Sequence, residues 1–232
     1  MNAIIDILSE LKNVIFPNVC PACHNNVMPQ GRLVCTPCLC ELPFTDHFDH
    51  HDNKVASHFY GRVKIYSAAG LLYFRENSFV QDIVHSFKYN HNKEIGIVLG
   101  KMAGEKMLMS SGFRQAEVII PVPLHPKKEY VRGYNQSFVF GEAIAKTMKI
   151  EVLNDVLVKG KSNESQTGKN RIERVKNVLE TYDLKNKDKI KNKHVVLVDD
   201  VITTGATLEA CIMTLYEALP SKISVVTLAC AQ

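Results

Sequence analysis

The clearest pattern along the chain is an apolar run that ends in two carboxylates. Residues 195–198 are apolar and mostly β-branched, and Asp199 and Asp200 follow them directly. Such a run is typical of a strand that is buried on both faces of a parallel sheet. A small polar turn at 203–207 comes next, and the apolar spacing after it predicts a helix that ends near Pro220. Because ligands of open α/β sheets bind outside the carboxyl ends of the strands, this unit is the main candidate for a binding site.

Hydrophobic periodicity also predicts the other elements. Apolar runs predict strands at 117–124, 151–158 and 223–228, and two short runs within 63–74 predict a hairpin or two adjacent strands. Helical stripes of apolar residues predict helices at 3–15, 79–89, 95–109 and 133–146. In the third of these helices, Gly100 and Gly104 are four residues apart and favour close packing on another helix. The alternation of strands and helices indicates an α/β fold, a parallel sheet flanked by helices.

Composition and charge limit the location and the partners of the protein. The chain has 232 residues, of which 46% are hydrophobic, and this suffices for a full core. No apolar run approaches the roughly 18 to 20 residues that cross a bilayer, so no transmembrane segment is expected. The first sixteen residues include Asp6 and Glu10 and lack a cleavage site, which predicts a cytoplasmic protein. A net charge of +4 is too small to indicate nucleic-acid binding by itself.

Most of the cysteines are concentrated near the N-terminus. Two CxxC pairs, separated by eleven residues, contain Cys20, Cys23, Cys35 and Cys38. In a reducing compartment this spacing favours a tetrahedral zinc, with a disulfide pair or an iron–sulfur site as alternatives. Four thiolates leave no open coordination position, so the expected zinc is structural. Cys40 and His24 are alternative ligands, whereas Cys211 and Cys230 lie in apolar patterns and are expected to be buried.

The turn after the two carboxylates has the composition of an anion site. Gly205 allows a close approach of the backbone, and the threonine hydroxyls of 203–207 can donate to phosphate oxygens. The start of the following helix adds unpaired backbone N–H groups. Asp199 and Asp200 are suited instead to ribose hydroxyls or to a magnesium ion that bridges to a diphosphate.

Cations follow the strand at 117–124, at the edge of the sheet where a diphosphate would lie. They are His125, Lys127, Lys128 and Arg132, and the alternative interpretation is a solvated basic turn. A polar, basic segment at 159–171 is suited to a loop that closes over an anionic ligand. Five lysines at alternate positions from 185 to 193 are more typical of a solvated edge.

These motifs, taken in order, resemble a known family. The stretch 199–207 is similar to the phosphoribosyl diphosphate (PRPP) motif of type I phosphoribosyltransferases. The cysteine pairs, the 121–125 and 132–136 segments, and Gln166-Thr167 with Arg171, Arg174 and Asn177 extend the likeness over nearly the whole chain. In this order and spacing the chain resembles the ComF family, including ComFC and GntX proteins, which joins a small zinc module to a phosphoribosyltransferase-like domain.

The resemblance implies a role for each part of the site. Asp199 and Asp200 would face the ribose and Mg²⁺, and the 5′-phosphate would be held by Thr203, Thr204, Gly205, Ala206 and Thr207. The diphosphate would be held by Val122, Pro123, His125, Lys127, Lys128 and Arg132. A flexible loop would contain Gln166, Lys169, Arg171 and Arg174. Family members often carry arginines where this chain has Lys127, Lys128 and Tyr130, and lysine lacks the bidentate geometry of arginine.

The expected organisation is a helix and zinc module at 1–45, a loop or linker at 46–62 and a phosphoribosyltransferase-like domain at 63–232. The resemblance further implies a role in natural transformation, with the machinery that handles incoming single-stranded DNA. Two functions remain open, a magnesium-dependent phosphoribosyl transfer to an unknown acceptor and a non-catalytic module that binds single-stranded DNA or a partner. A third, a receiver-like acidic pocket, needs a phosphoacceptor aspartate at another strand end, and none is evident.

Overall fold

The computed structural model describes residues 19–23, 25, 27, 34–160 and 182–231. Two sequence predictions lie outside these residues, the helix at 3–15 and the candidate zinc ligand His24. The expected loop residues Gln166, Lys169, Arg171 and Arg174 lie outside them as well. No helix in the described parts of the chain is long and apolar enough to cross a membrane.

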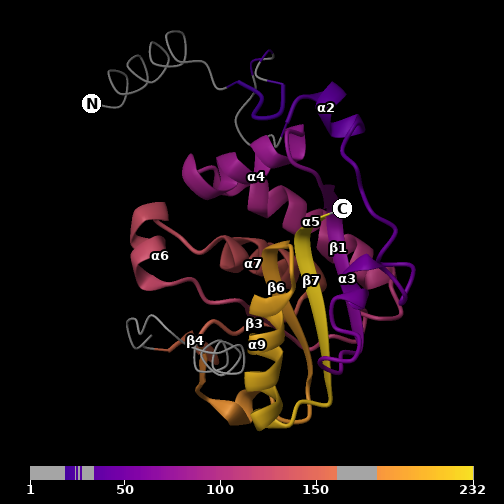
Figure 1. Ribbon diagram of the computed structural model, residues 1–232, viewed down its shortest axis with the longest axis vertical. Coiled ribbons are helices and arrows are strands. Elements are labelled where there is room, and N and C mark those ends of the chain that lie inside the picture. The colour runs from indigo at the N-terminus through magenta and orange to yellow at the C-terminus, as the bar shows by residue number, and fades with distance from the viewer. Residues whose placement is uncertain (1–18, 24, 26, 28–33, 161–181, 232) are drawn as a thin grey trace, which may run out of the picture.

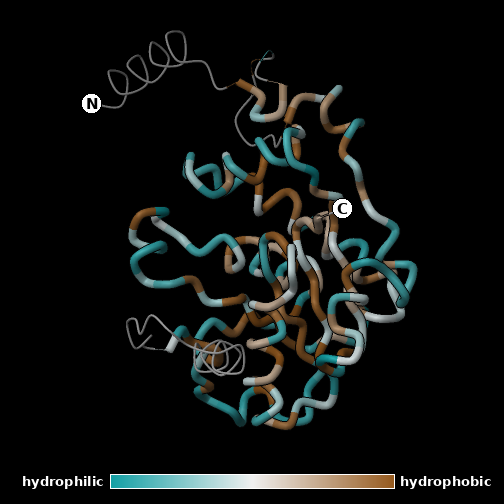
Figure 2. The backbone as a smooth tube through the Cα atoms, in the orientation of Figure 1, coloured by the Kyte–Doolittle hydropathy of each residue, from teal (hydrophilic) through white to brown (hydrophobic). Residues whose placement is uncertain are grey.

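A five-stranded parallel sheet forms the centre of the molecule (Figure 1), in the order β1-β7-β6-β2-β3. The strands are β1 (Ser67–Phe74), β2 (Val118–Pro121), β3 (Glu151–Val152), β6 (His194–Ile202) and β7 (Lys222–Ala231). Residues 194–198 of β6 are all buried, as expected for a strand covered on both faces, and Figure 2 shows the central strands as hydrophobic segments. The predicted α/β fold with a parallel sheet is therefore confirmed, and β7 lies beside β6.

Helices cover both faces of the sheet. One face packs against α4 (Phe79–Tyr89), α5 (Lys93–Met109) and α7 (Gln136–Met148), and the other against α3 (Lys54–Ser57) and α9 (Ala206–Leu215). Successive residues of β6 alternate between the two resulting cores: Val196 and Val198 belong to the first, and Val195 and Leu197 to the second. Figure 1 shows α9 in front of the sheet and α7 behind it.

The glycine pair of α5 makes the close helix contact that the sequence predicts. A Cβ added to Gly100 would lie 2.6 Å from the Cβ of Ala143 and 2.6 Å from the carbonyl oxygen of Phe140. A Cβ added to Gly104 would lie 2.7 Å from the Cβ of Thr147. Since all three partners belong to α7, no residue larger than glycine fits either position without a shift of the helices.

The hairpin expected within 63–74 does not form, and a single strand, β1, takes its place. The small residues around Gly70 are not a turn, because β1 runs parallel to β7 from Ser67 to Phe74. A Cβ on Gly70 would lie 3.0 Å from the Cβ of Cys230, so glycine here permits close contact between the strands. The candidate strand at 151–158 is likewise divided, into β3 and β4 (Leu157–Lys159), and β4 pairs antiparallel with β5 (Tyr182–Leu184).

The stretch 46–62, expected to be a loop, contains the short helix α3. Asn53 caps it, because its side-chain oxygen accepts from the backbone N–H groups of Val55 and Ala56. Val55 and Phe59 are buried in the core that α9 also contacts. The local cap and these apolar contacts fix the stretch against the sheet. The remaining elements are α2 (Thr36–Cys40), α6 (Pro126–Arg132), η1 (Lys187–Lys189) and η2 (Tyr216–Ala218).

Candidate functional site

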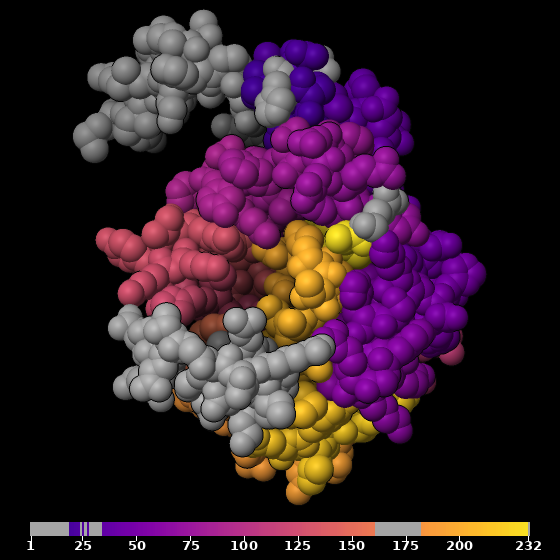
Figure 3. All heavy atoms as spheres, in the orientation of Figure 1, coloured from indigo at the N-terminus to yellow at the C-terminus, as the bar shows by residue number. Residues whose placement is uncertain are grey.

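A cleft of about 440 Å³ lies where the carboxyl ends of β2 and β6 meet. Figure 3 shows this face of the molecule hollowed between α6 and the end of β6. The lining residues are Lys88, Val122, Pro123, Leu124, His125, Lys128, Arg132, Asn135, Gln136, Ser137, Lys159, Tyr182, Asp199, Asp200, Val201 and Thr207. The strand end with two carboxylates and the strand end with several cations therefore open into the same cleft.

Both carboxylates are held by side chains from the helical layer. The hydroxyl of Ser137, on α7, donates to Oδ1 of Asp199 at 2.9 Å, and the backbone N–H of Asp200 donates to the same oxygen at 2.9 Å. The ammonium of Lys88, on α4, lies 3.1 Å from Oδ2 of Asp200. Burial raises the pKa of Asp199, and the charge of Asp200 raises it further. Asp199 therefore favours a cation or a hydrogen-bond donor at this position.

The turn at 203–207 forms a small recess at the start of α9. Gly205 has a left-handed backbone, with φ of 75°, and a recess of about 40 Å³ is enclosed by Asp199 and residues 201–208. An anion there would face the first N–H groups of α9. The predicted strand-turn-helix unit is thus formed as the sequence indicates.

Arg62 braces this turn from outside. Its guanidinium donates to the carbonyl oxygens of Thr204 at 3.4 Å and His58 at 3.3 Å, and it lies 3.1 Å from the carboxylate of Glu209 on α9. Sequence reasoning missed Arg62, Ser137 and Lys88. Ser137 directly follows the 132–136 segment, which was a usable signal, whereas Lys88 and Arg62 reach the site only through tertiary packing.

The predicted basic turn after β2 is the helix α6. Pro126 is its first residue, Nδ1 of His125 accepts from the backbone N–H of Lys127 at 3.2 Å, and Gly133 ends it with φ of 75°. These are ordinary start and stop signals, but α6 buries none of its residues and so lacks an apolar stripe. The cleft is lined by Lys128, whereas Lys127 is exposed and does not line it.

Arg132 already has partners within the protein. Its Nη1 donates to Oε1 of Gln136 at 2.9 Å, and its guanidinium carbon lies 5.2 Å from the ring centroid of Tyr89. Tyr134, two residues later, is buried, and its hydroxyl donates to the carbonyl oxygen of Phe87 on α4. The segment 132–136 therefore joins α6 and α7 to α4 while it lines the cleft.

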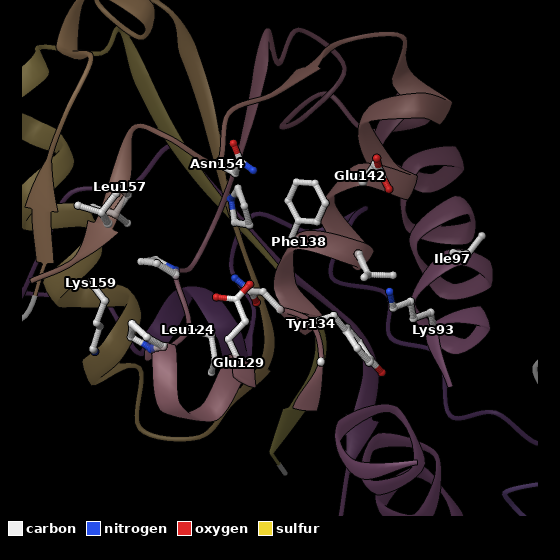
Figure 4. Close-up of a pocket in the computed structure, with 17 residues that line it drawn as sticks. Lys93, Ile97, Leu124, Glu129, Tyr134, Phe138, Glu142, Asn154, Leu157 and Lys159 are labelled. Carbon is white, nitrogen blue, oxygen red and sulfur yellow. The ribbon is translucent and has the colours of Figure 1, made fainter. Parts of the chain in front are cut away.

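A second cavity, of about 620 Å³, lies beneath α6 and shares residues 123–124, Asn135 and Lys159 with the cleft. Figure 4 shows Glu129 of α6 between Lys159 of β4 on one side and Lys93 of α5 on the other. The ring of Phe138 faces this space from α7. The connection between β2 and α6 thus borders both cavities, and of the two only the cleft is lined by Asp199 and Asp200.

The four cysteines of the CxxC pairs form one cluster. Their sulfur atoms all lie within 4.8 Å of one another, and the Sγ atoms of Cys23 and Cys35 are 3.8 Å apart. Tetrahedral zinc with Zn–S bonds of about 2.3 Å places its sulfurs about 3.8 Å apart, so the cluster can hold zinc. Cys40 is exposed and outside the cluster, and Cys211 and Cys230 are buried as predicted.

Comparison with known proteins agrees with this architecture. Residues 135–231 match the family described as "Phosphoribosyl transferase domain". The chain is 37% identical to "Competence protein F" of Haemophilus influenzae over 40% of this chain and 41% of the relative. It is 26% identical to "Competence protein ComFC" of Bacillus subtilis over 86% of this chain and 78% of the relative. It is 26% identical to "DNA utilization protein YhgH" of Salmonella typhimurium over 54% of this chain and 56% of the relative.

Among solved structures, the glutamine PRPP amidotransferase from B. subtilis aligns with a TM-score of 0.45 at 19% identity, over 62% of this chain and 30% of that one. The alignment with the H. influenzae and S. typhimurium relatives spans about half of their length or less. The sequence matches, the parallel sheet and the cysteine cluster all agree with the fold and the cysteine module that the sequence motifs predict. The chain is a homologue of competence protein F and ComFC that carries a phosphoribosyl transferase domain.

Proposed function

We propose that the protein binds PRPP with Mg²⁺ and acts as a phosphoribosyltransferase of the ComF type in DNA uptake. The observation that carries this proposal is the convergence of three features on one cleft. They are the carboxylates of Asp199 and Asp200, the phosphate-sized recess at 201–208, and the cations of α6. PRPP has a sugar with two hydroxyls between a 5′-phosphate and a diphosphate, and each feature suits one of these parts.

The two ends of the ligand have separate sites. The 5′-phosphate would lie in the recess before α9, where backbone N–H groups and the hydroxyls of 203–207 can donate to it. The ribose hydroxyls would donate to Asp199 and Asp200. The diphosphate would lie toward His125 and Lys128, at the opposite side of the cleft. Arg62 keeps its contacts with the turn and does not contact the ligand.

The residues fit Mg²⁺, which prefers oxygen ligands and keeps several waters when it binds a diphosphate. Asp199 is the better ligand, because burial and the charge of Asp200 raise its pKa and a cation would offset both, whereas Asp200 is paired with Lys88. Bound Mg²⁺ would neutralise charge on the diphosphate. The protein's own part is to hold the sugar by Asp199, fix that carboxylate through Ser137, and surround the leaving group with cations.

The proposed reaction replaces one bond at C1 of the ribose. A lone pair on the acceptor forms the new bond to C1, the bond from C1 to the diphosphate oxygen breaks, and its electrons leave with the diphosphate. The acceptor then loses a proton to solvent or to a base. Positive charge develops on the ring during this step, and the carboxylates of Asp199 and Asp200, which line the cleft, would stabilise it.

Calorimetry with PRPP and Mg²⁺ tests this function. Wild type should bind, and Asp199→Asn and Asp200→Asn should weaken binding at least tenfold because each removes a charged acceptor for ribose or Mg²⁺. Asp188→Asn, on the exposed η1, serves as the matched control and should bind normally. Absence of binding by wild type would rule the function out. Release of diphosphate with a panel of bases and amines would then identify the acceptor.

A second candidate function is binding of single-stranded DNA without turnover. It is favoured by relatives described as DNA utilization proteins and by the lysines at 185–193. Lys187 pairs with Glu217 and Lys189 with Asp155, which leaves Lys185, Lys191 and Lys193 without an ion pair among the described residues. Gel-shift titrations should show affinity that falls steeply with salt if these lysines contact phosphates. Salt-insensitive or absent binding would argue against it.

The proposal also includes the parts of the chain outside the cleft. We propose that the cysteine cluster binds a structural zinc ion and belongs to an N-terminal module at 1–45. Residues 63–232 would form the phosphoribosyltransferase-like domain. A reducing location such as the cytoplasm suits four zinc thiolates. Partners would come from the DNA-uptake machinery, which agrees with the names of the competence relatives.

A further inference from the structure

Lys159 lies on the wall of the cleft that faces α6, and sequence reasoning gave it no individual role. It is the last residue of β4 and pairs with Tyr182 of β5, whose ring centroid is 4.1 Å from the ammonium nitrogen. Tyr182 also lines the cleft. Lys159 borders both the cleft and the larger cavity beneath α6, and Figure 4 shows it across that cavity from Lys93.

The ammonium of Lys159 has no carboxylate partner among the described residues. At the end of β6, Asp200 is paired with Lys88 at 3.1 Å, and Asp199 accepts from Ser137 and from the backbone N–H of Asp200. Burial lowers the pKa of Lys159, and the charge of Lys128 on α6 lowers it too, although Cys211 and Asp199 act in the opposite direction. Two lysines from different elements therefore face one cleft at a distance where they repel each other. An anion between them would relieve both the repulsion and the loss of hydration.

A simpler explanation is that Lys159 only packs on the ring of Tyr182. Lys93 offers a direct comparison, because its ammonium also lies over an aromatic ring, 5.1 Å from the centroid of Tyr134, and it also lines the larger cavity. Lys93 does not line the cleft, however, and its side chain is exposed. Lys159 differs in being half-buried, beside a second lysine, and open to the carboxylate cleft.

The position of Lys159 indicates which part of the proposed ligand it would contact. The recess for the 5′-phosphate is enclosed by Asp199 and residues 201–208, and Lys159 is not part of it. Lys159 and Lys128 both border the cleft, together with His125. The guanidinium of Arg132 is meanwhile occupied by Gln136 and Tyr89. Among the described residues that line the cleft, Arg132 thus already has partners, whereas Lys128 and Lys159 have no ion pair.

Resting on the proposed PRPP function, we propose that Lys159 and Lys128 together hold the diphosphate of the ligand, with Lys159 as the cation supplied from outside α6. When the bond to C1 breaks, its electron pair stays on the diphosphate, and both ammonium groups contact the group that gains this charge. Because lysine binds phosphate as a point charge, two lysines from different elements compensate for the bidentate contact that a single arginine would make.

The test compares Lys159→Met with wild type in calorimetric titrations of magnesium diphosphate, ribose 5-phosphate and PRPP. Methionine keeps an unbranched chain against Tyr182 and removes only the charge. Binding of diphosphate and PRPP should weaken at least tenfold, and that of ribose 5-phosphate should change less than twofold. Lys159→Arg should restore most of the affinity. Lys93→Met is the matched control and should bind all three ligands as wild type does.

Each other outcome has a definite meaning. Unchanged diphosphate binding by Lys159→Met, or equal weakening for ribose 5-phosphate, would overturn the role of Lys159 and leave the proposed function intact. A wild type that binds ribose 5-phosphate but not diphosphate would also overturn it. A wild type that binds neither would reject the proposed function itself. Equal thermal midpoints of wild type and Lys159→Met would establish that the comparison is between folded proteins.

Discussion

Among single residues, His194 shows most clearly how burial determines charge in this protein. It begins β6, its Nε2 lies 2.8 Å from the hydroxyl of Ser224, and the ring of Tyr66 meets it edge-on with centroids 5.3 Å apart. Burial, reinforced by the charge of Lys222, lowers the pKa of His194 to about 4. The imidazole is therefore neutral in the folded protein at pH values where an exposed histidine would be charged.

This shift predicts a specific loss of stability in acid. Between pH 6.5 and 4 the unfolded chain binds a proton at His194 and the folded chain does not, so the free energy of unfolding should fall as the pH falls. The loss should be on the order of 2 kcal/mol and complete below about pH 4. Urea unfolding across this range should give a shallower pH dependence for His194→Gln than for wild type. The exposed His85→Gln should keep the wild-type slope, and parallel profiles for wild type and His194→Gln would contradict the prediction.

The residues of the cleft differ in how far sequence could identify them. Asp199, Asp200 and the turn at 203–207 form one local unit, because strand, carboxylates and helix start are contiguous in the chain. Lys159 and Arg62 leave no such local trace. Their sequence segments predict loops. Lys159 reaches the cleft, and Arg62 the turn, only because β4 and α3 pack beside the sheet.

At the scale of elements, the contact between α5 and α7 depends on the absence of side chains. Gly100→Ala would normally favour a helix, by about 1 kcal/mol. Here its methyl group would clash with Ala143 and with a backbone oxygen of α7, so the free energy of unfolding should instead fall by about 1 to 3 kcal/mol. Urea unfolding measures this change. Lys101→Ala, at the exposed neighbouring position, is the control and should stay within about 0.5 kcal/mol of wild type.

A double variant tests which contact causes the loss of stability in Gly100→Ala. Ala143→Gly in the background of Gly100→Ala should restore only part of the stability, because the oxygen of Phe140 remains 2.6 Å from the new methyl group. Full recovery would mean that the side-chain contact alone sets the spacing of the helices. A stability gain in Gly100→Ala would show that α5 and α7 can separate at no cost.

Element prediction succeeded where burial left a periodic pattern. The strands β2, β6 and β7 and the helices α4, α5 and α7 all bury an apolar face, and the sequence showed each of them. It did not show α6, which buries nothing, although Pro126 and Gly133 mark its two ends. The run at 63–74 predicts a hairpin because a glycine between two apolar runs is typical of a turn, whereas Gly70 lies within β1 and allows the approach of Cys230. That partner is distant in sequence and could not be inferred locally.

On the scale of the whole molecule, the cysteine cluster joins the N-terminal module to the domain core. Val34, Cys35 and Cys38 belong to the same apolar cluster as Leu72 of β1 and Ile83 of α4. Loss of a metal there would release the module and expose this part of the core. The carboxylate cleft is lined mainly by residues 122–137 and by the end of β6, with Lys88 as its residue from α4, so it should respond less than the overall stability does.

Removal of zinc should therefore lower the thermal midpoint of the full chain by roughly 5 to 15 °C, the range expected when several kcal/mol are lost from a chain of this size. Cys38→Ser should reproduce this loss and reduce the zinc content measured by atomic absorption. Cys40→Ser should change neither value, since Cys40 is exposed and outside the cluster. Equal zinc content in wild type and Cys38→Ser would contradict the assignment of the ligands.

The exposure of α6 bears on how this protein can diversify. Its outward positions, including Tyr130 at 90% and Val131 at 73% exposure, contribute almost nothing to the core, yet the helix borders both cavities. Substitutions cost most stability at buried positions, where they leave cavities or force overpacking. Here substitutions at residues 127–131 should cost little stability, so the side chains that α6 presents to the two cavities can change while the sheet and its two cores stay unchanged.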